Sequence, residues 1–110
     1  MGIIKKSNIY LLKVSPDGIY KIGVAKNVNR RVKQLQTGNP EKIEIIKIFP
    51  TNYPFKIESY LHRKHSFNHV QGECYYMSEQ DIKDFDDTCS LCERNFEIME
   101  NMNNEFDMYY

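Results

Sequence analysis

The stretch NIYLLKVSPDGIYKIGVAKNVNRR, residues 8–31, decides the fold that we predict. Residues 9–14 are a run of bulky and β-branched side chains that favours a strand, and residues 19–24 are a second such run. Between them, Ser15-Pro16-Asp17-Gly18 is typical of a tight turn, because proline presets φ and glycine accepts a positive φ. The stretch therefore predicts a β-hairpin followed by the basic start of a helix.

Two tyrosines and one arginine stand out in this stretch. In an antiparallel hairpin, residues that face each other lie about 5 Å apart, so we expect Tyr10 and Tyr20 to lie close together and to share one face. The helix after the hairpin begins at Asn27, a good N-cap, and ends near Gln36. Its apolar stripe consists of Val28, Val32 and Leu35. Arg31 borders this stripe and can point toward the tyrosines; the alternative is an ordinary solvated charge.

The rest of the chain adds strands and two helices to this hairpin. Residues 43–49 are predicted to form a third strand, and residues 55–67 a helix with Pro54 near its start. Residues 73–77 are predicted to form a short strand or an extended segment. A last helix begins after Ser78 and keeps apolar residues at alternating spacings of three and four, as in a helix-packing seam. The predicted fold is a small α/β domain: a three-stranded antiparallel sheet flanked by helices, with a C-terminal helical appendage.

The helix over residues 55–67 carries a row of groups that can bind a metal. Glu58, His62 and His65 follow one another at i, i+4 and i+7, so they share one face. One interpretation is that Glu58 alone holds Mg²⁺, which keeps most of its waters, and another is that all three residues bind Zn²⁺. A third is an ordinary polar helix face with a weak Glu–His pair. Spacing alone favours the third interpretation.

The net charge of zero hides two halves of opposite sign. Residues 1–70 contain 13 lysines and arginines against 4 acids, whereas residues 71–110 contain 2 against 11. A basic body favours a polyanionic partner, and the acidic end can shield that body or mimic the partner. The alternative is that the opposite charges neutralise each other within the monomer.

Cysteine usage and hydropathy restrict the environment of the protein. Three cysteines are an odd number, and the chain shows no export signal, so we expect reduced thiols and no disulfide framework. Cys89 and Cys92 fall on the apolar seam of the last helix, where small buried residues are expected and half a zinc site is not. No apolar run is long enough to span a bilayer. We therefore expect an intracellular, soluble protein that makes no membrane contact.

Several motifs in a fixed order resemble those of a known family. They are Asn8-Ile9-Tyr10, Tyr20-Lys21-Ile22-Gly23, Arg30-Arg31, Gln34-Leu35-Gln36-Thr37-Gly38-Asn39-Pro40, Ile57-Glu58-Ser59-Tyr60-Leu61-His62 and Gly72-Glu73-Cys74-Tyr75. Together they resemble the GIY-YIG nuclease superfamily, in its small phage- and virus-borne branch. Asn8 stands where the first motif has glycine, and Cys74 where an aromatic residue is usual. The resemblance implies a nuclease domain over residues 1–85 and an acidic helical extension over residues 86–110. If the protein is viral, it would work in the cytoplasm or nucleus of the host.

The resemblance also implies a site and a reaction. Tyr10 and Tyr20 take the places of the two motif tyrosines, one of them as the base or the group that orients water, and Arg31 binds the scissile phosphate. Glu58 positions one divalent ion, Mg²⁺ or Mn²⁺, opposite the leaving group, and His62 supports Glu58 or relays a proton. Such groups can hydrolyse a DNA phosphodiester. The cations expected to bind nucleic acid are Lys21, Lys26, Arg30 and Lys33.

Three functions follow from these observations. The leading one is a metal-dependent DNA endonuclease with DNA as its partner. The second is a catalytically weak or inactive nucleic-acid-binding module, because the polar residue that the superfamily carries late in the domain, often asparagine, has no counterpart here. The third is an interaction protein that forms a homodimer or docks a partner through the acidic C-terminal helix. The seam of that helix consists of Ile82, Phe85, Cys89, Cys92, Phe96 and Met99. We expect this seam to pack on the domain itself, because it is short for a coiled coil between two chains.

Overall fold

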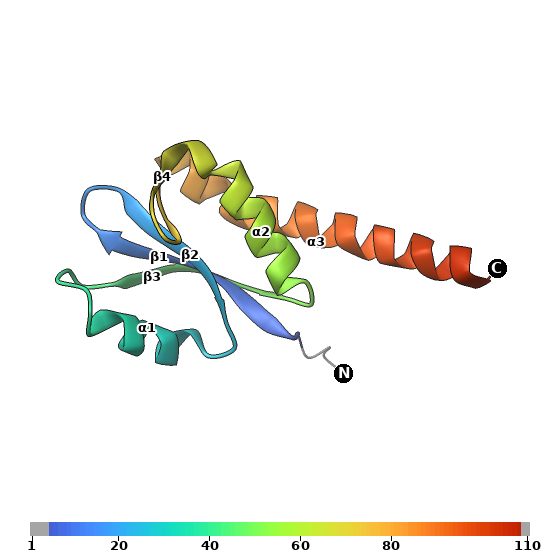
Figure 1. The fold of residues 1–110 in the computed structure, drawn as a ribbon, viewed down its shortest axis with the longest axis horizontal. Helices are drawn as coiled ribbons and strands as arrows, with labels where there is room; N and C mark the ends of the chain where they lie inside the picture. The colour runs from blue at the N-terminus through green and yellow to red at the C-terminus, as the bar shows by residue number, and fades with distance from the viewer. Residues whose placement is uncertain (1–4, 109–110) are drawn as a thin grey trace.

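The computed structural model describes residues 5–108, with side chains described as far as residue 103. Five antiparallel strands form one sheet in the order β3-β1-β2-β5-β4. The strands are β1 (Ser7–Ser15), β2 (Ile19–Ala25), β3 (Glu44–Thr51), β4 (His69–Gln71) and β5 (Cys74–Tyr76). The helices are α1 (Val28–Gln36), α2 (Pro54–Lys64) and α3 (Glu79–Met108), with a short 3₁₀ turn, η1 (Ser66–Asn68), after α2. Helix α1 covers one face of the sheet, and α2 with the first part of α3 covers the other (Figure 1).

The predicted hairpin and first helix are confirmed. Strands β1 and β2 pair antiparallel on either side of a turn at Gly18, whose φ of 81° is the left-handed conformation that glycine adopts without strain. Helix α1 begins after Asn27, whose side chain accepts a hydrogen bond of 3.0 Å from the Arg30 backbone N–H. Local signals in residues 8–36 are therefore enough to specify this half of the fold.

The prediction of a three-stranded sheet is wrong, because the sheet has five strands. Strands β4 and β5 contain 3 residues each, which is too short for an alternating pattern to show in the sequence. Gly72, with a φ of 54°, makes the turn between them. Strand β5 falls within the predicted segment 73–77, and it pairs with the outer edge of β2. This pairing brings residues near position 73 beside β2.

A β-bulge decides which face of the sheet each β2 side chain takes. Ser15 pairs with Ile19 at the turn, but Lys13 pairs with Tyr20, so the register shifts by one residue between these two pairs. Because neighbouring residues of a strand alternate between the faces, the shift turns Tyr20 to the face opposite to Tyr10. The expectation that the two phenols share one face is therefore wrong.

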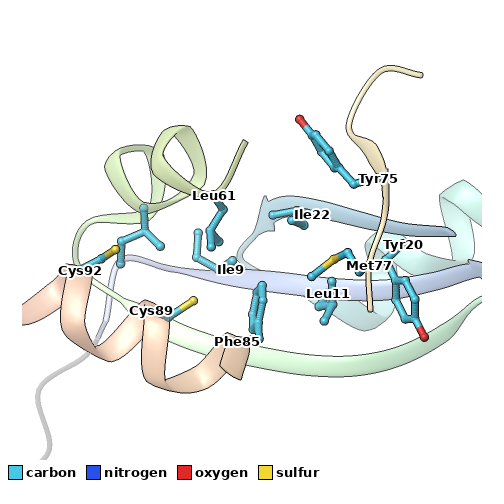
Figure 2. Packing of buried hydrophobic residues seen from close by; sticks show 11 residues of the cluster. Ile9, Leu11, Tyr20, Ile22, Leu61, Tyr75, Met77, Phe85, Cys89 and Cys92 are labelled. Carbon is cyan, nitrogen blue, oxygen red and sulfur yellow. The ribbon is translucent and has the colours of Figure 1, made fainter. Parts of the chain in front are cut away.

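The two tyrosines belong to separate cores. Tyr10 is buried between the sheet and α1, where it packs with Leu12 and Val28. Tyr20 is buried on the opposite face, in the core that α2 and α3 close. Figure 2 shows this larger core, in which Phe85 and Cys89 of α3 lie against the sheet.

Helix α3 runs without a break through the expected domain boundary at residues 85 and 86. The seam residues Phe85, Cys89 and Cys92 are buried in the core of the same chain, which confirms that the seam packs on the domain. Because these thiols are already covered, the buried part of the seam is not free to pair with a second chain. Met99 lies outside this packing and is exposed. No helix within residues 5–108 is both long and apolar enough to cross a bilayer.

Burial raises the pKa of the Cys89 thiol from its ordinary value of 9.0 to about 12. The unfolded chain ionises this thiol near pH 9 and the folded chain keeps it neutral. Its contribution to stability is therefore complete below pH 9 and is lost as the pH rises toward 12. We expect the free energy of unfolding, measured by urea titration, to lose about 1 kcal/mol between pH 9 and pH 10 through this group. Cys89→Ala should lose correspondingly less, and equal losses in the two proteins would contradict this origin.

Candidate active site

Three side chains that can bind a metal meet beside the outer edge of β2. Glu58, His62 and Glu73 each offer one ligand atom, and these atoms lie within 4.8 Å of one another. Glu58 and His62 are one turn apart on α2, and Glu73 is brought in by the turn that precedes β5. Carboxylate oxygens are ligands that Mg²⁺ and Mn²⁺ prefer in proteins. The donor set therefore fits one divalent ion.

His65, the third member of the predicted row, is not part of this cluster. It is the C-cap residue of α2 and is buried, with its ring centroid 6.4 Å from that of Tyr75. Burial lowers the pKa of His65, so its neutral form is favoured. The prediction that Glu58, His62 and His65 together can bind Zn²⁺ is therefore wrong. Glu73 is the third member of the cluster.

One ring nitrogen of His62 is already engaged by the backbone of β2. His62 Nε2 lies 3.1 Å from the carbonyl oxygen of Ile22. A carbonyl oxygen can only accept a hydrogen bond, so Nε2–H donates it and Nδ1 is the nitrogen left for another partner. Histidines that bind metals usually donate their second ring N–H in this way, which fixes the ring. His62 is thus prepared to accept a proton or to bind a cation through Nδ1.

Charge around Glu58 favours a cation in the cluster. Burial raises the pKa of the Glu58 carboxyl, and the neighbouring Glu73 raises it further, while His62 and Lys21 act in the opposite direction. Lys21 Nζ lies 3.4 Å from Glu73 Oε2, so this lysine offsets part of the negative charge. A carboxyl group that resists ionisation beside a second carboxylate is stabilised as a carboxylate by a nearby cation.

The Tyr10 ring lies across β2 at Gly23. Gly23 is its partner in the ladder, and a Cβ built there would lie 2.9 Å from Tyr10 Cε1 and closer still to Cζ and the hydroxyl oxygen. Gly23 directly follows Ile22, whose carbonyl oxygen contacts His62. Because Gly23 has no side chain, the Tyr10 ring can lie across β2 on the face that α1 covers. Gly23 is one residue from Ile22, which His62 of α2 contacts.

Gly23→Ala should displace the Tyr10 ring, because the added methyl group occupies the space of the phenol. We expect a loss of about 1–3 kcal/mol in the free energy of unfolding, measured by urea titration. In a Tyr10→Ala background the obstructing ring is gone, so the same glycine substitution should cost much less. Equal costs in the two backgrounds would show that the close approach of Tyr10 to Gly23 does not matter for stability.

The remaining predicted residues lie on or near α1. Arg31 is on the helix that covers Tyr10, and its Nη1 donates a hydrogen bond of 3.4 Å to Gln34 Oε1. Lys26, Arg30 and Lys33 are exposed, and no ion pair engages any of them in the part of the chain that the structure describes. The acids of α3 that form ion pairs meet other lysines. These pairs are Lys5–Glu93 at 3.2 Å and Lys47–Asp86 at 3.1 Å.

Sequence reasoning gave Lys21 only a nucleic-acid contact and gave Glu73 no role. Lys21 pairs with Leu12, so Lys21, and not Tyr20, is the β2 side chain on the face of Tyr10. Glu73 was visible only as part of the motif Gly72-Glu73-Cys74-Tyr75, with no role attached to it. Glu73 directly precedes β5. Its carboxylate can be assigned to the site only once β5 is known to pair with β2.

Together the fold and the cluster define a small α/β domain with a candidate divalent-metal site beside strand β2 of its sheet. The model of the T5orf172 domain matches residues 8–92. The chain therefore belongs to the T5orf172 domain family, and this domain is associated with phage-type nucleases. The match spans the whole cluster and extends into α3 as far as the buried Cys92. No curated protein and no solved structure gives a significant match.

Proposed function

We propose that this protein is a metal-dependent DNA endonuclease that hydrolyses phosphodiester bonds. The cluster of Glu58, His62 and Glu73 supports this proposal most directly, because it brings a metal-type donor set together in a chain of a nuclease-associated family. The resemblance of the motifs to the GIY-YIG superfamily agrees with a metal-binding role for Glu58. The proposed substrate is DNA, and the proposed ion is Mg²⁺ or Mn²⁺.

The carboxylates and cations of the site have complementary roles in this proposal. Glu58 and Glu73 hold the divalent ion, which when bound supplies positive charge beside the phosphate. Arg31 binds the scissile phosphate through its planar array of N–H donors. Lys21 compensates Glu73 in the free protein. When phosphate enters, Lys21 can neutralise part of its charge as well.

Tyr10 and His62 are the groups that we assign to the attacking water. Their placement on either side of β2 at Ile22 and Gly23 supports this pairing. Tyr10 orients the water through its hydroxyl group, and His62 accepts the proton on Nδ1, the nitrogen that Ile22 leaves free. Tyr20 is given no role in this proposal, because the register of β1 and β2 places it on the face of the sheet opposite to Tyr10.

Contacts outside the reacting phosphate are assigned to α1 and the segment before it. Lys26, Arg30 and Lys33 are exposed cations that follow β2 in the chain. Such side chains bind phosphates of the DNA backbone without reading its sequence. Their affinity for DNA should therefore fall steeply as salt rises.

A nucleic-acid-binding module that does not cut is the second candidate. One observation favours it: on the face of the sheet where Tyr10 lies, β2 presents Lys21 in place of a second tyrosine. A site with one phenol has fewer groups that can activate water. The basic segment around α1 would still bind nucleic acid in this case.

Incubation with supercoiled plasmid separates the two candidates. A nuclease converts the plasmid to nicked and linear forms with Mg²⁺ or Mn²⁺ and stops in EDTA. Arg31→Ala should lose cutting, which excludes a contaminating nuclease. Retained DNA binding without any cutting by the wild-type protein would establish the second candidate and overturn the first.

A further inference from the structure

We infer that a basic cavity beside the candidate active site binds a single strand of nucleic acid. The protein would then act on substrates that have an unpaired segment next to the cleaved bond. The link to cutting depends on the proposed function, whereas the binding itself does not. Three features of the cavity support this assignment: its charge, its exposed aromatic ring and its position on the same strand and helix as the site.

The cavity has a volume of about 1060 Å³ and lies where the start of β1, the end of β2 and the start of α2 come together. Four lysines and one acid are among its lining residues. They are Lys5, Lys6, Lys26, Lys56 and Glu100. Four lysines against one carboxylate leave this concave surface with an excess of positive charge, so the cavity favours a polyanion.

The lysines of the cavity differ in their partners, and Lys56 Nζ lies over the rings of Tyr53 and Phe96, 6.0 and 5.5 Å from their centroids. Lys5 is paired with Glu93, and Glu100 accepts a hydrogen bond from the Tyr53 hydroxyl. Among the described residues, no carboxylate forms an ion pair with the other three lysines. Those three lie just before β1, just after β2 and on α2, so they approach the cavity from different sides and can contact successive phosphates.

An exposed aromatic ring distinguishes the cavity from a simple basic patch. Phe55 is 71% exposed and lines the cavity from the first turn of α2. A large apolar ring surrounded by lysines is poorly explained by packing, but it suits the stacking of a base. Stacking of this kind requires an unpaired base, because bases in a duplex are already stacked on each other. The cavity therefore selects a single strand over a duplex.

Strand β2 and helix α2 each contribute residues both to the cavity and to the candidate active site. Val24 and Ala25 of β2 and the following Lys26 line the cavity, and the same strand reaches the site at Lys21. At about 3.3 Å per residue, Lys21 and Lys26 are roughly 16 Å apart along the strand. On α2, Phe55 precedes Glu58 by about one turn. Strand β5 pairs with β2 only as far as Lys21, so that pairing does not extend to the stretch of β2 beside the cavity.

Fluorescence anisotropy with a labelled oligothymidylate of about 12 nucleotides tests the assignment, in EDTA so that cutting cannot interfere. Phe55→Ala should weaken binding about tenfold, with an unchanged dependence on salt. Lys56→Gln should instead lower the slope of log affinity against log salt by about 0.7, the value for one phosphate contact on a single strand. The duplex of the same length should bind more weakly and should not respond to Phe55→Ala.

Matched controls are available at the other end of α2 and just beyond it. Phe67 is 100% exposed and Lys64 is exposed, and neither lines the cavity. Phe67→Ala and Lys64→Gln remove the same groups and should leave binding of the oligothymidylate nearly unchanged. Equal losses in the two pairs of variants would overturn the assignment of the cavity. Equal affinity for the duplex, or equally strong competition by poly-aspartate, which has no bases, would overturn the assignment of a single strand.

The test of single-strand binding and the test of plasmid cutting can give opposite results. An intact response to Phe55→Ala in a protein that never cuts plasmid would count against the nuclease and support the cavity. Plasmid cutting by a protein whose single-strand binding ignores Phe55→Ala would support the nuclease and count against the cavity.

Discussion

Glu58→Gln should lower the rate of plasmid cutting by at least about a hundredfold while the protein stays folded and still binds DNA. The substitution keeps the size of the side chain but removes the negative charge that a hard divalent ion needs. Loss of a metal's charge stabilisation removes several kcal/mol from the transition state, and each 1.4 kcal/mol is about a factor of ten in rate. Nicking of supercoiled plasmid measures the rate of cutting. Circular dichroism checks that the variant is folded, and a binding assay checks that it still binds DNA.

Glu41→Gln is the matched control for this substitution. Glu41 is exposed in the segment between α1 and β3 and lies outside the cluster, so its loss of charge should leave cutting unchanged. Full activity of Glu58→Gln, or undiminished cutting in EDTA, would refute metal-dependent hydrolysis through Glu58. A parallel loss of DNA binding would show that Glu58 acts on the fold and not on the reaction.

Phe85→Ala should have the largest effect on stability, about 3–5 kcal/mol. Phe85 is 2% exposed, and its ring fills the space between α3 and the sheet in the core that Figure 2 shows. Removing the ring leaves a cavity that the surrounding strands cannot close. A domain of this size has a total stability of roughly 5–15 kcal/mol, so the variant would lose a large share of it.

Urea unfolding measures this loss, and Leu91→Ala on the same helix provides the comparison. Leu91 is 60% exposed, so its truncation should change the free energy of unfolding by less than about 0.5 kcal/mol. Both substitutions place alanine in α3, so differences in helix propensity are small. Similar effects of the two substitutions would mean that α3 does not close the core as described.

The hairpin and α1 could be predicted from the sequence because their signals are local. A turn with Pro16 and Gly18, and an N-cap at Asn27, act within a few residues and do not depend on distant packing. Strands β4 and β5 have no such signals. Three residues cannot show a period of two, so they become strands only because β2 offers them an edge.

The expectation that Tyr10 and Tyr20 share one face failed because of a register shift between Lys13 and Ser15 in β1. Carried along the strands, the register at the turn, where Ser15 faces Ile19, would place Tyr10 and Tyr20 on the same face. The bulge between Lys13 and Ser15 reverses this parity for every later pair. No residue type in this stretch is specific to a β-bulge, so the sequence does not predict it. The motif therefore predicted Tyr20 beside Tyr10, whereas the register of the strands places Lys21 on the face of Tyr10.

Two of the three members of the candidate metal cluster could be predicted from the sequence. Glu58 and His62 share a helix face through their spacing alone, and spacing is a property of the sequence. Glu73 joins them through the pairing of β5 with β2 and the turn at Gly72, which are tertiary features. His65 was predicted on the same row, but it caps the helix and turns into the core.

Helix α3 is continuous in Figure 1, yet its two ends differ in what holds them in place. Around Phe85 and Cys89 the helix shares the core of the domain, so its amide hydrogens can exchange with solvent only when the domain unfolds. From Glu97 to Asn103 every side chain is exposed. A helical segment without apolar packing is marginal in water, so it opens at a small cost in free energy. One element of secondary structure thus contains two units of cooperative unfolding, and the boundary between them follows burial and not hydrogen bonding.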